Sequence, residues 1–391
     1  MKKMYWTAYN VHPILMIILC VISLSCLYVV ETNKEMVKAQ HYDAKLQATH
    51  TAQKAFEAIK QYRLNSGFSI DNRFDLSGMG LIGEKNSSIT SDHGVLQSKQ
   101  IATNPNLAAL IVEWLDDLNL KPGDTIAIGM TGSFPGLDIS TLAAAKALKL
   151  KPMVIVSAAG SQWGANVPHF SILDMLALLN NQHIIDTPVL AASIGGAKDL
   201  GKSLDPKGVR ILEDTIKRYD IDMISEPRVS KSITKRLSLY KKTAGKEKIK
   251  AYINIGGGVA SIGKHFTQKN LTSDQKEDIL KHSLKTGPNT TLPVALADTN
   301  SVAVRFLKQG TPVINVKNIS LIAAKYNLEP WHTSGEIGKG ALFFNPQYNL
   351  WYAGTSLVLI LGLCWLLVKL QLVQKRANDD LLQQSETSPI L

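Results

Sequence analysis

Two long apolar runs stand near the two ends of the chain. The first covers 14–30 (ILMIILCVISLSCLYVV), the second covers 351–368, and neither contains a charged residue. A helix needs about 17–25 mostly apolar residues to cross a bilayer, so each run is long enough. Tyr and Trp residues flank both runs, at the interfacial positions that aromatic side chains prefer. The pattern predicts two transmembrane helices.

The first run could instead belong to a signal peptide, because two lysines precede it. No small-x-small cleavage pattern follows it, and Ser23 stands where a lipobox before Cys26 would have Leu, so an uncleaved helix is favoured. Two spans place both termini on one side, and the Lys and Arg residues behind the second span indicate that this side is the cytoplasm. We therefore expect cytoplasmic ends at 1–13 and 369–391.

The residues after the first run have helical spacing. Apolar side chains recur every three or four positions between Glu35 and Arg63, which predicts an amphipathic stalk helix over 31–64. The next stretch, 65–95, is rich in Gly, Ser and Asn and is typical of a loop or short hairpin. We expect it to begin a large extracytoplasmic domain over 65–350.

From residue 100 onward, β-branched runs alternate with helical patterns. The apolar runs that read as strands lie at 125–130, 152–160, 188–196, 251–258, 292–299 and 312–316. This alternation is typical of an α/β domain with a mostly parallel, doubly wound sheet. Asp138 and Thr141 recur as Asp298 and Ser301 at one offset, which indicates two related halves, although ordinary strand–helix periodicity produces similar echoes.

The composition gives the chain a positive net charge, and the positions of its cysteines argue against a disulfide in the large domain. The chain has 43 Lys and Arg against 32 Asp and Glu, a formal net charge of +11. A basic surface suits anionic partners, although surplus charge also serves solubility alone. Cys20, Cys26 and Cys364 all lie in the apolar runs, so the large domain has no disulfide. The histidines have no metal-site spacing, and the basic residues do not alternate with aromatics, so we expect no metal, cofactor or nucleic acid.

Small and polar residues follow four of the predicted strands, at 129–136 (GMTGSFPG), 157–166 (SAAGSQWGAN), 193–199 (SIGGAKD) and 254–265 (NIGGGVASIGKH). Ligands of open α/β sheets bind where such loops meet, outside the carboxyl ends of the strands. Tight turns also need Gly, Ser and Asn, but four such loops together predict a site for a carboxylate or phosphate. The candidate ligand-binding residues are Thr131, Gly132, Ser133, Ser157, Ser161, Asn166, Asn254, Gly257, Gly258 and Lys264.

The same loops allow two enzymatic alternatives. Ser133 could be a nucleophile with His265 as its base and Asp138 orienting the imidazole, which would make an extracytoplasmic amide hydrolase or transferase. Gly258 and Lys264 fit part of a phosphate loop, but His265 stands where the Mg²⁺-binding Ser or Thr belongs. A nucleotide-dependent cytoplasmic enzyme is therefore the less favoured alternative.

With its apolar ends and the segments GMTGSFPGLDIS, SAAGSQWGAN and NIGGGVASIGKH, the chain resembles the bacterial poly-gamma-glutamate system protein family over most of its length. The resemblance implies a place in the bacterial cytoplasmic membrane, beside the ATP-dependent ligase of poly-gamma-glutamate synthesis and its small membrane subunit. It carries over no catalytic residue. Because the polymer is a polyanion, we expect an accessory protein of its assembly or export that binds the polymer, another anionic ligand or a synthase subunit.

Overall fold

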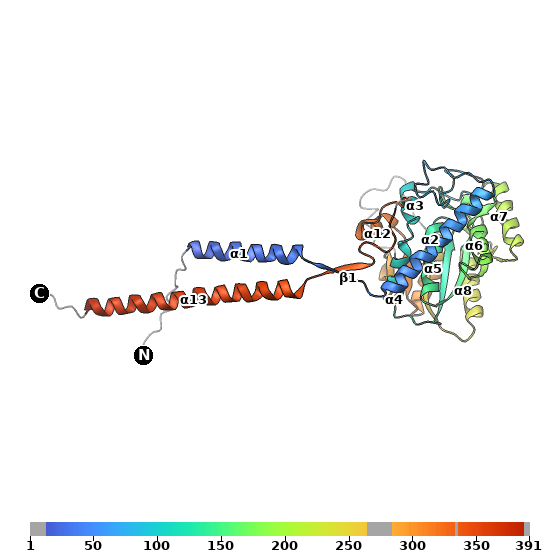
Figure 1. Ribbon diagram of the computed structural model, residues 1–391. Coiled ribbons are helices and arrows are strands. Elements are labelled where there is room, and N and C mark those ends of the chain that lie inside the picture. Colours follow the sequence, from blue (N-terminus) through green and yellow to red (C-terminus); the bar gives the residue numbers. More distant parts are fainter. Residues whose placement is uncertain (1–12, 264–283, 297, 333–334, 387–391) are drawn as a thin grey trace. The chain divides into compact units, whose positions relative to one another are not determined.

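The computed structural model describes residues 13–263, 284–296, 298–332 and 335–386. Within these ranges the chain forms two units (Figure 1). The larger unit is Ala39–Phe343, and the smaller unit joins the described parts of Met1–Lys38 and Phe344–Leu391. The candidate residues Lys264 and His265 lie outside the described residues.

The smaller unit pairs the two ends of the chain. Helix α1 (Pro13–Thr32) lies beside helix α13 (Leu350–Glu386), and strand β1 (Glu35–Lys38) pairs antiparallel with strand β11 (Phe344–Gln347). The segments Pro13–Thr32 and Leu350–Val373 are each long and apolar enough to cross a membrane, and neither is buried within the protein. This agrees with a two-pass membrane protein.

The larger unit is built on a seven-stranded sheet with the order β7-β6-β3-β2-β8-β10-β9. Its strands are β2 (Thr125–Thr131), β3 (Lys151–Ser157), β6 (Val189–Ser193), β7 (Asp222–Met223), β8 (Ile249–Ile255), β9 (Gly287–Asn289) and β10 (Val313–Val316). Neighbouring strands are parallel except β9 and β10, which are antiparallel. The predicted α/β class with a mostly parallel sheet is confirmed, whereas double winding and two related halves stay predictions.

Helices connect these strands and pack around the sheet (Figure 1). They are α2 (Tyr42–Asn65), α3 (Leu96–Ala102), α4 (Leu107–Asp116), α5 (Pro135–Ala147), α6 (Ile172–Asn181), α7 (Pro206–Arg218), α8 (Val229–Ala244), α9 (Val259–Ile262), α11 (Val302–Lys308) and α12 (Ile319–Tyr326). Short elements complete the unit: strands β4 (Asn166–Val167) and β5 (Phe170–Ser171), and 3₁₀ turns η1 (Ala197–Asp199) and η2 (Val294–Leu296).

Both faces of the central strand β2 are buried. Ala127 belongs to an apolar cluster with Tyr240 of α8, Tyr252 of β8 and Phe306 of α11. The rings of Tyr252 and Phe306 stack with their centroids 5.0 Å apart. Ile128 points to the opposite face, because successive strand side chains alternate, and it is also fully buried. Burying a large apolar side chain contributes about 1.5–3 kcal/mol, so this core holds the strand ends in a fixed register.

The expected continuous stalk helix over 31–64 is wrong. Helix α1 ends at Thr32, β1 follows, and α2 begins only at Tyr42, after His41 at a positive φ of 56°. The apolar stripe of α2 is real, but it packs against α4 and α5 of the larger unit. Its fully buried members are Ala48, Ala52, Ala55, Phe56 and Ile59. The stripe therefore covers the domain's own core, and the larger unit begins at Ala39.

The predicted strand at 292–299 is also wrong. The described part of this segment holds the short turn η2, and the edge strand β9 lies before it, at Gly287–Asn289.

Candidate functional site

Polar side chains gather at the edge of the sheet where the parallel strands end. Each of five strands carries one such buried side chain near its carboxyl end: Thr131, Ser157, Ser193, Asn254 and Asn315. The strand order reverses between β2 and β8, because β3, β6 and β7 lie on one side of β2 while β8 and β10 lie on the other. Ligands of open α/β sheets bind at such a reversal. The geometry therefore points to the β2–β8 junction.

Glycines let the two chain segments approach each other closely at this junction. Gly256 follows β8 with a φ of 80°, and a Cβ atom there would lie 2.6 Å from Thr131 Oγ1. At Gly258 a Cβ atom would lie 3.4 Å from Thr131 Cγ2 and 3.7 Å from Ser157 Oγ, which is ordinary contact. The ends of β2, β3 and β8 thus lie close together at this junction, for which we use the name β2–β8 crevice.

Asn254 supplies an unused hydrogen-bond acceptor beside the β2–β8 crevice. Its Nδ2 donates to Gly256 O at 2.9 Å and to Asn315 Oδ1 at 3.0 Å. Its Oδ1 is buried and has no hydrogen-bond partner among the described residues. Leaving a buried acceptor unpaired costs about 1–3 kcal/mol, and such a cost is commonly found at ligand sites. A ligand N–H group would satisfy this oxygen.

A buried ion pair lies next to the β2–β8 crevice. Arg236 Nη2 lies 3.0 Å from Asp199 Oδ2 and donates to Ser193 Oγ at 2.7 Å and to Ser157 Oγ at 3.2 Å. Ser232 donates to the same Asp199 oxygen at 2.6 Å. The polar groups on β3, β6, α8 and η1 are thus joined in one network. The network holds Ser157 beside Gly258.

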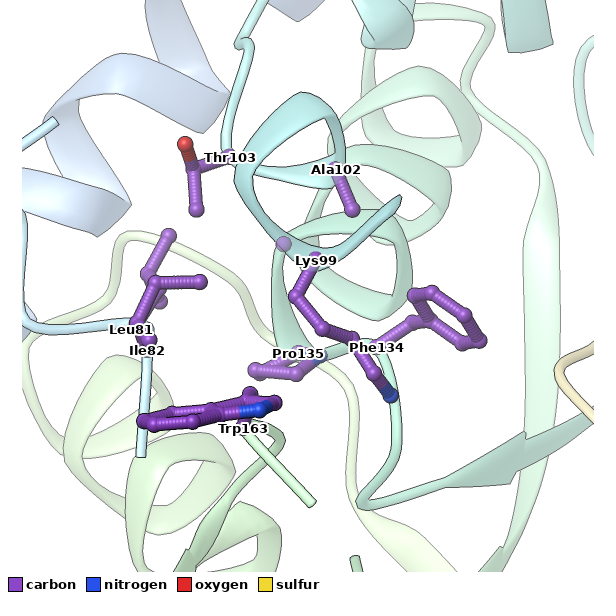
Figure 2. Close-up of a pocket in the computed structure, with 9 residues that line it drawn as sticks. Leu81, Ile82, Lys99, Ala102, Thr103, Phe134, Pro135 and Trp163 are labelled. Atoms are coloured by element: carbon purple, nitrogen blue, oxygen red, sulfur yellow. The ribbon is translucent and has the colours of Figure 1, made fainter. Parts of the chain in front are cut away.

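A second buried cationic side chain, Lys99 of α3, lies against the loops that follow β2 and β3. Lys99 is 3% exposed, and its Nζ donates to Ser161 Oγ at 2.7 Å and to the backbone oxygen of Ser133. Nζ also lies 3.8 Å from the centre of the Phe134 ring. Figure 2 shows the lysine side chain running between Phe134 and the Trp163 and Pro135 side chains. Burial lowers the pKa of Lys99 to about 7, and the nearby Asp138 opposes that decrease.

Asp138, in the first turn of α5, is fully buried beside this lysine. Neither of its carboxyl oxygens has a hydrogen bond of normal geometry among the described residues. Burial raises the pKa of Asp138 well above its ordinary value, and Lys99 and a weak backbone interaction with Thr131 act in the other direction. The charge of Lys99 therefore acts on the Asp138 carboxyl without forming a hydrogen bond to it.

The loops after β2 and β3 bring Ser133 and Ser161 together. Gly132 N–H donates to Ser157 O at 3.1 Å, and Ala165 N–H donates to Gly132 O at 2.6 Å. With the two loops held together by these bonds, the Ser161 N–H donates to Ser133 Oγ at 3.1 Å. The Ser133–His265–Asp138 triad stays a prediction, because His265 lies outside the described residues.

The remaining candidates have distinct positions. The Asn166 amide is used within the protein: Oδ1 accepts from Glu84 N–H at 2.9 Å, and Nδ2 donates to Glu84 O and Thr90 Oγ1. It fixes the loop at 84–90 and has little capacity left for a ligand. Gly257 is exposed, between Gly256 and Gly258.

Among the residues that the structure describes, no group of three His, Cys, Asp or Glu side chains could hold a metal ion.

Sequence reasoning missed Lys99 and Arg236. A signal for Arg236 existed, because Ser232, Arg236 and Tyr240 recur every four positions on α8 and therefore share one face. Lys99 had no comparable signal, since α3 is a single short helix of seven residues. Its burial depends on loops that are distant in the sequence.

Compared with known proteins, the chain matches no family model, no curated protein and no solved structure. The structure shows an α/β domain with a mostly parallel sheet and buried polar side chains at the strand ends where the strand order reverses. Two apolar helices, each long enough to span a membrane, come before and after this domain in the sequence.

Proposed function

We propose that this chain is a membrane-anchored accessory protein of poly-gamma-glutamate assembly or export. Its α/β domain lies outside the cytoplasm and binds the polymer in the β2–β8 crevice. The observation that carries the proposed site is the buried Oδ1 of Asn254, which has no hydrogen-bond partner among the described residues, beside the glycines that follow β8. The polymer itself is proposed from the sequence resemblance.

The chemistry of the polymer fits the groups in the β2–β8 crevice. Each γ-glutamyl unit has an amide N–H, which can donate to Asn254 Oδ1, and a carboxylate, which can accept from hydroxyl groups. Thr131 and Ser157 supply hydroxyl groups at the ends of β2 and β3. Ser157 Oγ accepts from Arg236 and donates to Asp199 Oδ1 over a long 3.4 Å, and the proposed ligand carboxylate would replace Asp199 as the acceptor of this proton. The net charge of +11 favours the approach of a polyanion.

Binding is tested with the full-length protein in detergent and fluorescently labelled poly-gamma-glutamate. We expect Gly258→Ala to weaken binding at least tenfold, because its Cβ would occupy the β2–β8 crevice while making only ordinary contacts. Gly354→Ala is the matched control, since nothing lies within 4 Å of the Cβ it adds. Equal affinity for wild type and Gly258→Ala would contradict the proposed site.

The side of the membrane is tested separately. In a variant whose three cysteines are replaced by serine, Lys202→Cys provides one thiol at an exposed position of the domain. We expect an impermeant maleimide to label it in intact cells. If labelling needs permeabilised cells, the domain faces the cytoplasm and the proposal fails.

The hydrolase alternative keeps one supporting observation, which is the group formed by Ser133, Ser161 and Lys99. The phosphate-loop alternative rests on Lys264, outside the described residues, and stays a prediction.

A further inference from the structure

The contact between Lys99 and Ser161 joins a buried amine to a buried hydroxyl. Nζ and Oγ are 2.7 Å apart, and the two residues are 3% and 9% exposed. Among the described residues, Ser161 Oγ has no other hydrogen-bond partner, so its own proton is not committed elsewhere. This is the distance at which a general base takes a proton from a nucleophile.

We propose that Ser161 and Lys99 form a serine–lysine catalytic pair for the hydrolysis of carboxylic esters or amides, with Ser161 as the nucleophile and Lys99 as the general base. Related serine–lysine pairs occur on unrelated folds and are recognised by geometry and not by sequence order. The inference does not rest on polymer binding in the β2–β8 crevice. It also differs from the predicted triad, in which Ser133 was the nucleophile.

Lys99 needs a neutral form to act as a base, and its surroundings favour that form. The side chain lies among Leu81, Ile82 and Trp163, which offer a charged amine little solvation, and this burial outweighs the attraction of the charged form to the Phe134 ring (Figure 2). With a pKa of about 7, a large fraction of Lys99 is neutral near neutral pH. A neutral amine keeps two N–H groups and one lone pair. It can therefore donate to Ser133 O and accept the Ser161 proton together.

The reaction proceeds in two balanced steps. As Ser161 Oγ bonds to the substrate carbonyl carbon, its proton moves to Lys99 Nζ, and the bond to the leaving alcohol or amine then breaks as that group takes the proton. This leaves an acyl ester on Ser161. A water molecule then attacks the ester carbon and gives one proton to Lys99. The ester bond breaks, the acid is released, and Ser161 Oγ recovers the proton.

Helix α5 stabilises the negative charge that develops on the substrate carbonyl oxygen. It begins at Pro135, directly after Phe134, whose ring lies against Lys99 Nζ. The positive end of the helix dipole lies in this first turn and stabilises a nearby oxyanion.

The lining of the space beside Lys99 limits the substrate. Its apolar walls favour an uncharged acyl group, and the space is too narrow for a water molecule. Trp163 closes one side with a positive backbone φ of 66°, and its ring lies 4.5 Å from that of Phe74. Because the space is this narrow, it must widen before a substrate reaches Lys99, and displacement of the Trp163 side chain would widen it.

The pair is tested by treating the full-length protein in detergent with diisopropyl fluorophosphate and mapping the adduct by mass spectrometry. We expect the adduct on Ser161, formed faster as the pH rises through 7. Ser161→Ala abolishes the adduct, whereas Ser238→Ala, at an exposed position of α8, leaves it unchanged. Lys99→Met slows adduct formation at least a hundredfold, and Lys235→Met at another exposed position does not.

Mapping of the wild-type protein decides the test even if a variant does not fold. Absence of an adduct on Ser161, or an adduct that forms equally fast in Lys99→Met, would overturn the catalytic pair. Loss of polymer binding in Gly258→Ala reports on the β2–β8 crevice alone, so the two proposals fail independently.

Discussion

Arg236 Nη2 lies 3.0 Å from Asp199 Oδ2, and both side chains are at most 3% exposed. Asp199 and the preceding Lys198 have positive φ angles of 64° and 59°. Such backbone conformations cost free energy in residues other than glycine, so the ion pair and its serine neighbours stabilise the loop that holds the aspartate. The pair is the polar centre on which the ends of β3 and β6 depend.

Removing one partner of this pair is expected to destabilise the protein strongly. Arg236→Met leaves the Asp199 carboxylate buried without its cation, and such changes lower the free energy of unfolding by about 3–5 kcal/mol. Urea unfolding of the full-length protein in detergent, followed by tryptophan fluorescence, measures the change. Lys151→Met is the control, because its ion pair with Glu247 is exposed and its loss should not shift the midpoint detectably. An unchanged midpoint for Arg236→Met would contradict this role.

The buried lysine gives stability a definite pH dependence. The pKa of Lys99 falls from 10.5 to about 7 on folding, so the unfolded chain binds more protons between these pH values. The free energy of unfolding should therefore rise with pH from 7 towards 10.5, by up to about 1.4 kcal/mol per pH unit. Below pH 7 the lysine is protonated in both the folded and the unfolded chain, so the destabilisation caused by burying it is present in full. Urea midpoints of wild type and Lys99→Met at pH 7 and 9 measure the difference.

Asp138, near Lys99, gives the free energy of unfolding the opposite dependence on pH. Because its pKa is raised, the folded state holds its proton longer, and this contribution to stability is lost as the pH rises through the raised pKa. Lys99→Met also removes the effect of the lysine on the pKa of Asp138, so the comparison with wild type measures the lysine together with its coupling to Asp138. A gain from pH 7 to 9 that is equal in the two proteins would show that Lys99 is not the cause.

Gly208 of α7 allows a close approach of two backbone segments. A Cβ atom at this position would lie 1.8 Å from Ser88 O and 2.4 Å from Ser88 C. Gly208→Ala must displace the loop at 84–90 and should lower the free energy of unfolding by about 1–3 kcal/mol or more. Thermal unfolding measured beside Gly354→Ala separates this clash from any general effect of adding a methyl group. Equal melting temperatures for the two variants would mean that the loop at 84–90 moves aside without lowering the free energy of unfolding.

Trp163 controls access to the proposed catalytic pair. Trp163→Ala removes the ring that lies beside Lys99 and Phe74, so diisopropyl fluorophosphate should react with Ser161 at least tenfold faster. The rate of adduct formation at fixed reagent concentration measures this. Phe74→Ala removes the neighbouring ring and should give a smaller increase. A slower reaction in Trp163→Ala would show that the ring positions the serine instead of covering it.

The sequence pattern located five of the seven strands of the sheet but neither β7 nor β9, and it did not locate the buried basic residues of the site. Runs of β-branched residues located β2, β3, β6, β8 and β10, because strands buried on both faces need continuous apolar side chains. The two-residue strand β7 is too short to produce a pattern.

The site depends on contacts that no local pattern encodes. Lys99 and Arg236 resemble solvated basic residues in the sequence, and each becomes buried only when distant loops fold over it. The predicted ligand Asn166 has the right chemistry, but the loop at 84–90 uses its amide. The apolar stripe of α2 was recognised correctly, yet periodicity cannot say whether it covers a partner or the chain's own core.

The antiparallel pairing of β1 with β11 has a consequence for proteolysis. Both connections between the α/β domain and the apolar helices run through this one ribbon. A single cut within the domain leaves each fragment attached to its own helix. Release of the intact domain from both apolar helices therefore requires two cuts, one in each connection, and a protease that cuts only one connection leaves the domain attached through the other.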